Sequence, residues 1–177
     1  MLTGELGAKM TRNFTAQLAG QIGESLAVAE LGRRGIVATA FSGNVPDIDL
    51  LAYMNGKTLH LQVKAWRTGA VSFDATRFLN IRREENVQIV EGLIEGLDAA
   101  LVYVFVKIGE TAGQDRFFVL RQWDLAEIIH TGYEGFLSKH NGVGLRNADT
   151  TQVAVGEADL ARFEGNWQIV ESCFYTC

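Results

Sequence analysis

Two apolar runs that flank Asn55 and Gly56 constrain the fold of this chain more than any other feature. Residues 49–54 form the first run, and residues 58–65 alternate between apolar and polar side chains. An Asn-Gly pair between two such runs is typical of a two-residue hairpin turn, because both residues tolerate positive φ. The sequence therefore predicts a β-hairpin over residues 49–65.

The second strand of this hairpin carries polar residues on one face. Side chains alternate along a strand, so His60, Gln62 and Lys64 point to the same side. The hairpin folds its first strand back against the second, which brings Asp49 close to Gln62 and Lys64. An aspartate and an amide oxygen suit a hard cation such as Mg²⁺, and a lysine can orient a water or offset charge on a phosphate. His60 lies two residues earlier and is expected at the surface.

The order and spacing of these residues resemble the PD-(D/E)XK nuclease superfamily, the fold of many restriction enzymes and of archaeal-type Holliday-junction resolvases. The resemblance covers about residues 16–66. It consists of a helix with the acidic Glu24, a strand and turn, Asp49 at the start of a second strand, and the triplet from Gln62 to Lys64 on the third.

This resemblance implies a restriction-endonuclease-like fold and a Mg²⁺- or Mn²⁺-dependent nuclease that hydrolyses phosphodiester bonds, with DNA as the expected substrate. The implied catalytic residues are Glu24, Asp49, Gln62 and Lys64, of which the first three would hold the metal. Gln62 replaces the usual acidic residue and removes one negative charge, so binding of a second metal should weaken. Family members that cut both strands usually dimerise, which makes a homodimer possible.

Two aspartates compete for the central position of the pattern. Asp47 follows Pro46 directly within the turn, whereas Asp49 is followed by the apolar residues 50–52. We choose Asp49 because a strand begins there. Asp47 is expected to contact the metal ligands but not the metal itself.

Each of the four residues also has a plainer interpretation. Glu24 could be a solvated helix carboxylate, although Ala27 and Leu31 lie on its side of the helix. Asp49 could bond its own backbone in a turn, and Gln62 and Lys64 could line the solvent face of an ordinary strand.

The rest of the chain predicts an α/β fold with a mixed sheet of about five strands flanked by helices. Leu18, Ile22, Leu26 and Ala29 recur at helical spacing within residues 16–34. Further strands are expected at residues 36–41, 99–108 and 116–120, and helical pieces at residues 123–130, 134–140 and 157–163. Residues 66–97 are compatible with either type. We expect one domain over residues 1–177, with a core at about 16–121 and a helical extension at about 122–177.

Charge and composition limit the classes of function that this chain can have. The net charge is −5, which disfavours a polyanion partner, yet residues 1–90 carry 10 Lys and Arg against 8 Asp and Glu. The chain offers no apolar run long enough for a membrane span and no signal-peptide pattern at its start, so we expect a cytoplasmic protein without membrane contact. Cys173 and Cys177 are expected to be reduced thiols. The alternative to a nuclease is a catalytically inactive module of this fold that binds nucleic acid or a protein.

Overall fold

The computed structural model describes residues 3–41, 47–144 and 149–175, with side chains from residue 16 onward. The predicted turn at residues 42–46, which includes Pro46, lies outside the described residues, as does Cys177. No helix in the described part is long and apolar enough to cross a membrane.

The chain forms an α/β fold whose main sheet is mixed and has five strands, as predicted. The strands are β1 (Val37–Ala40), β2 (Leu50–Met54), β3 (Lys57–Trp66), β7 (Val102–Lys107) and β8 (Arg116–Arg121), and their spatial order is β1-β2-β3-β7-β8. Only β3 and β7 run parallel, and the other pairs are antiparallel. Asn55 and Gly56 join β2 to β3 with φ values of 52° and 77°, which confirms the predicted hairpin turn.

Helices cover both faces of this sheet. Helix α1 (Thr3–Arg33) and helix α4 (Gln168–Tyr175) pack with Leu61, Val63 and the valines of β7 in one apolar cluster. On the other face, helix α2 (Gln122–Lys139) packs with Tyr103 and Phe105 in a second cluster. β7 alternates between the two clusters and is buried on both faces, as its nearly continuous apolar run predicted.

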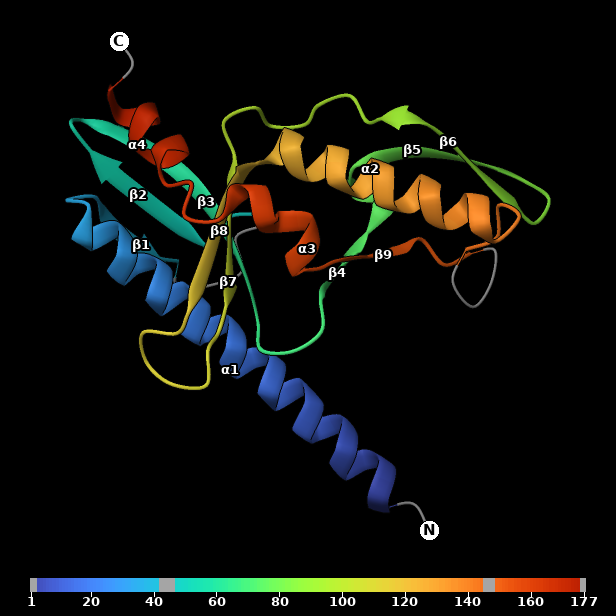
Figure 1. Ribbon diagram of the computed structural model, residues 1–177, viewed down its shortest axis with the longest axis horizontal. Helices are drawn as coiled ribbons and strands as arrows, with labels where there is room; N and C mark the ends of the chain where they lie inside the picture. The colour runs from blue at the N-terminus through green and yellow to red at the C-terminus, as the bar shows by residue number, and fades with distance from the viewer. Residues whose placement is uncertain (1–2, 42–46, 145–148, 176–177) are drawn as a thin grey trace.

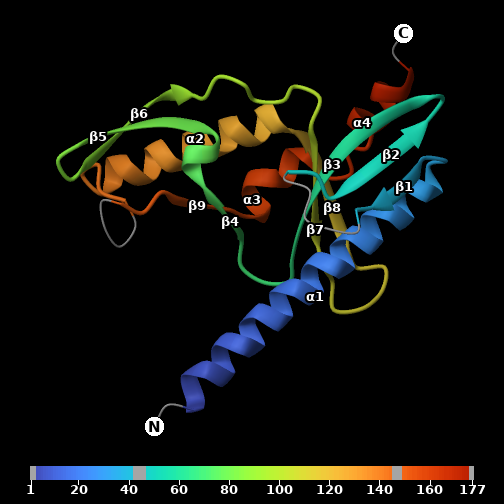
Figure 2. The ribbon, with the colours of Figure 1, turned by 180° about the vertical axis from the view of Figure 1, so that it is seen from behind.

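Two small sheets flank α2 (Figures 1 and 2). β5 (Leu79–Glu84) pairs with β6 (Val87–Leu93), and β4 (Val71–Asp74) pairs with β9 (Gln152–Val155). The short helical turn η1 (Ala75–Arg77) joins β4 to β5. The ambiguous segment of the sequence therefore contains three strands and one helical turn.

The two helical pieces expected at residues 123–130 and 134–140 are one continuous helix, α2. Gly132 lies in its middle, where an added Cβ would be 3.8 Å from Cγ2 of Val153 on β9. An alanine would fit at this distance as well, and the glycine does not end the helix.

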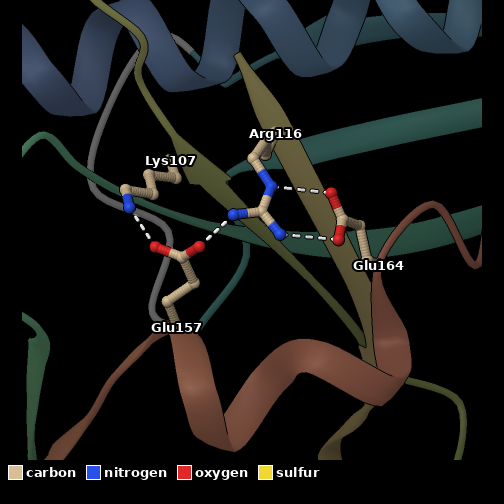
Figure 3. A network of polar contacts seen from close by, with 4 residues as sticks. All are labelled: Lys107, Arg116, Glu157 and Glu164. Atoms are coloured by element: carbon tan, nitrogen blue, oxygen red, sulfur yellow. Dashed lines mark hydrogen bonds and ion pairs between the residues drawn. The ribbon is translucent and has the colours of Figure 1, made fainter. Parts of the chain in front are cut away.

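The region after β9 is tied to the main sheet by an ion-pair network (Figure 3). Helix α3 (Glu157–Leu160) begins with Glu157, which contacts both Lys107 at the end of β7 and Arg116 at the start of β8. Arg116 also binds Glu164 in a bidentate manner, at 2.7 and 2.6 Å. Glu164 follows η2 (Ala161–Phe163). These four partly exposed residues fix α3 and η2 against the edge strand β8.

Candidate active site

The candidate site lies where β2 and β3 separate. β3 pairs with β2 only from Lys57 to Leu61, but its pairing with β7 continues to Trp66. The second half of β3 therefore has β7 on one side and an open edge on the other. An open edge leaves main-chain groups that need other partners.

Asp49 provides those partners at the point of separation. Its main-chain N–H donates to the carbonyl of Leu61 at 2.9 Å, and its Oδ2 accepts from the main-chain N–H of Val63 at 2.7 Å. The two partners, Leu61 and Val63, are the sequence neighbours of Gln62. Asp49 is therefore fixed beside Gln62, as the hairpin geometry predicted.

Gln62 is 5% exposed, and its side-chain oxygen has no hydrogen-bond partner among the described residues. A buried carbonyl oxygen without a partner costs free energy, on the order of 1–3 kcal/mol. Such a cost is common where an oxygen binds a ligand or a water. The neighbouring His60 is exposed and pairs with Leu51, so it lies at the surface as predicted.

Glu24 reaches the same place from α1. The most buried residues of α1 are Ala19, Gly23, Ala27 and Leu31, one position away from the stripe of larger residues that indicated the helix. A Cβ at Gly23 would overlap the Cβ of Ala65. The glycine therefore lets the helix contact β3 at its open edge, directly next to Lys64, and Glu24 follows it.

Electrostatics show that the three charged residues are close together. Burial raises the pKa of the Glu24 carboxyl, the charge of Asp49 raises this pKa further, and the charge of Lys64 lowers it. The pKa of Glu24 is thus affected by the charges of both Asp49 and Lys64. Asp49 is bonded to the main chain on both sides of Gln62, and Glu24 lies within electrostatic range of Asp49 and Lys64.

The donor set fits a hard cation. Two carboxylates and one neutral oxygen are oxygen ligands of the kind that Mg²⁺ and Mn²⁺ accept alongside water. Within the described residues no three His, Cys, Asp or Glu side chains form a metal-binding group. The fit therefore depends on the oxygen of Gln62 as the third protein ligand.

Two further residues lie close to these positions. Tyr103 on β7 pairs in register with Gln62. Its pKa is raised by burial and also by the charge of Asp49, while the charge of Arg77 lowers it. Arg77 forms an ion pair with Asp47. Tyr103 was not singled out from the sequence, and Arg77 counted only as one of the basic residues of the first half.

Several arginines of the basic first half of the sequence are paired within the protein. Arg33 and Arg34 pair with Glu30 on α1, and Arg82 pairs with Glu84 and Glu91 across the β5–β6 hairpin. The basic character of the first half of the sequence is therefore partly neutralised by neighbouring acids.

No protein-family model matches this sequence, and no curated protein matches it either. Among solved structures, a bacterial homing endonuclease, I-Ssp6803I, aligns with 90% of this chain and 95% of its own chain. The TM-score is 0.48 and the sequence identity is 16%. A likeness this distant assigns no function and no residue role to this chain.

Proposed function

We propose that this protein is a Mg²⁺-dependent nuclease of the PD-(D/E)XK type that hydrolyses phosphodiester bonds of nucleic acid, and specifically a DNA endonuclease. One observation carries the proposal: the side-chain oxygen of Gln62 is buried without a partner, at a residue whose two sequence neighbours are both hydrogen-bonded to Asp49. Glu24 and Lys64 complete the group. An ordinary solvent-facing strand would not bury an amide in this way.

In this proposal Glu24, Asp49 and Gln62 hold Mg²⁺ or Mn²⁺. When bound, the cation supplies Lewis-acid polarisation of a phosphate oxygen and lowers the pKa of a water. Oδ2 of Asp49 accepts from Val63, which leaves Oδ1 for the cation. The raised pKa of Glu24 falls again when a cation binds, because positive charge favours the carboxylate.

Lys64 acts on the substrate side of the same group. The residue is half-buried, and its charge acts on the carboxyl of Glu24. There it orients the attacking water and offsets the negative charge that develops on the phosphate. A compact ammonium with three donors suits both tasks.

The internal pairing of the arginines favours a second candidate, a catalytically inactive module of the same fold that binds nucleic acid or a protein partner. A chain with net charge −5 and neutralised arginines attracts a polyanion weakly. Under this second proposal Gln62 marks a site that has lost its metal.

A cleavage panel separates the two candidates. Purified wild type is incubated with Mg²⁺ or Mn²⁺ and with linear duplex, branched and single-stranded DNA and with RNA, and the Asp49→Asn variant is the matched control. Cleavage by wild type alone supports the nuclease. If wild type is inert on every substrate and Asp49→Asn changes neither metal binding by calorimetry nor DNA binding, the enzyme assignment is abandoned.

A further inference from the structure

Arg77 differs from the other described ion-paired arginines in the position of its partner. Its guanidinium pairs with Asp47, which is only two residues from Asp49 and so within about 7 Å along the backbone. The two side chains are 53% and 50% exposed. The pair is therefore accessible to a large ligand, and its acidic partner lies two residues from Asp49.

Arg77 is presented by an anchored turn. It is the last residue of η1, whose first turn is capped by Asp74: the Asp74 Oδ1 accepts from the main-chain N–H of Thr76 at 3.0 Å and from its hydroxyl at 2.8 Å. The same oxygen accepts from the Thr151 hydroxyl at 2.7 Å. Ala75 is fully buried. The backbone of Arg77 is therefore fixed, while its side chain stays accessible.

The guanidinium also lies near the deeper part of the site. Tyr103 pairs with Gln62 across the β3–β7 ladder, and both Arg77 and Asp49 act electrostatically on its hydroxyl. Arg77 thus lies on the side of the site formed by β7, whereas Lys64 lies on β3 and Glu24 comes from α1.

We propose that Arg77 is a phosphate-binding residue of this site, held by Asp47 in the free protein and transferred to a backbone phosphate of the bound nucleic acid. The inference rests on the proposed function. An exposed ion pair is weak, so exchange of a carboxylate for a phosphate is cheap. The planar guanidinium also matches two phosphate oxygens at once. Asp47 thereby keeps Arg77 from binding other anions.

Four proteins test the inference: wild type, Arg77→Ala, Asp47→Asn and the double variant. Asparagine tolerates the left-handed backbone of Asp47, whose φ is 66°, so this change removes charge without straining the turn. Binding of a fluorescent duplex DNA is measured by anisotropy in EDTA, where no cleavage occurs, over a range of salt concentrations. Arg82→Ala is the matched control, because Arg82 is also exposed and ion-paired but lies on the β5–β6 hairpin.

Arg77→Ala is expected to lower the slope of log affinity against log salt by about 1, as the loss of one phosphate contact does. Asp47→Asn is expected to tighten binding, and most of this gain should vanish when Arg77 is also alanine. Arg82→Ala should keep the wild-type slope. Thermal melting verifies that each variant is folded.

The inference is overturned if Arg77→Ala binds DNA as wild type does, if Arg82→Ala lowers the slope equally, or if the gain from Asp47→Asn is the same in both backgrounds. In these cases wild type still binds DNA, and the proposed nuclease function stands. If wild type binds no nucleic acid in EDTA, Mg²⁺ or Mn²⁺ and cleaves none, the proposed function fails and the role of Arg77 fails with it.

Discussion

The main-chain N–H of Val63 donates a hydrogen bond to Oδ2 of Asp49, 2.7 Å away. The carboxylate therefore has one structural task, and the proposed metal site gives it a second. One oxygen completes the open edge of β3, and the other would bind the proposed cation. Substitutions at Asp49 can separate these tasks.

Asp49→Asn keeps an oxygen that can accept from Val63 but removes the charge. We expect loss of metal-dependent cleavage with a free energy of unfolding close to that of wild type. Asp49→Ala also leaves the N–H of Val63 without its partner, so it should cost a further 1–2 kcal/mol or so in stability. Urea unfolding in EDTA measures the difference, and equal stabilities of the two variants would contradict the structural task.

Lys64→Ala should reduce cleavage by roughly 10²–10³-fold, the scale of losing one electrostatic stabiliser of the transition state. The half-buried side chain contributes little to the fold, so the melting temperature should stay close to that of wild type. Lys64→Arg should not restore the rate, because a planar guanidinium cannot replace a compact ammonium. Single-turnover kinetics provide the measurement, and a rate unchanged in Lys64→Ala would exclude a catalytic role.

Gln62→Met replaces the unpartnered buried amide with an apolar side chain of similar length. In EDTA we expect a gain in stability of about 1–3 kcal/mol, since the cost of the unpaired oxygen disappears. The same change should remove the stabilisation that Mg²⁺ gives the wild type. Gln62→Glu should instead bind the metal more tightly, because it adds a negative charge, and calorimetry measures this affinity. Unchanged metal affinity in both variants would show that Gln62 is not a ligand.

Glu24 should make stability depend on pH. Because burial and Asp49 raise its pKa in the folded state, the folded protein binds this proton more tightly than the unfolded chain does. The stabilisation is therefore present at low pH and lost as the pH rises through the folded pKa. Glu24→Gln should melt higher than wild type at pH 7 in EDTA, and the difference should disappear below about pH 4, where the unfolded carboxyl is also protonated. A lower melting temperature for Glu24→Gln at pH 7 would contradict this.

Gly23→Ala tests how the helix positions Glu24. The new Cβ would overlap Ala65, so α1 must move away from β3, and we expect a loss of roughly 1–3 kcal/mol in stability together with reduced cleavage. Gly20→Ala is the matched control, because an added Cβ there meets nothing within 4 Å. It should stabilise the helix by about 0.5–1 kcal/mol. Equal changes in stability at both positions would show that the close contact with Ala65 does not set the position of α1 against β3.

The sequence predicted the elements that depend on local patterns. The turn at Asn55 and Gly56, the alternation along β3 and the apolar run of β7 each specify one structure, and together they place Asp49 beside Gln62. Ala27 and Leu31, on the same side of α1 as Glu24, are fully buried, as expected.

The remainder depends on long-range contacts that no local pattern encodes. β4 pairs with β9, about eighty residues away in sequence, so residues 71–74 alone gave no clear signal. The buried face of α1 is set by the close approach of Gly23 to Ala65, which favours small residues over the larger stripe. The turn of η1 that carries Arg77 is anchored by Thr151, more than seventy residues away in sequence.

The pairing of β4 with β9, and the ion pairs of Glu157 with Lys107 and Arg116, also affect how the chain is made. A ribosome releases residues 71–74 and the whole of β7 well before residues 152–164 exist. Until then the cover of one face of the main sheet is incomplete, because Val153, Val155, Leu160 and Phe163 belong to the same apolar cluster as α2. The nascent chain should therefore stay sensitive to protease until residues 152–164 have emerged and packed. Early termination after residue 121 would release a product that exposes this face and aggregates.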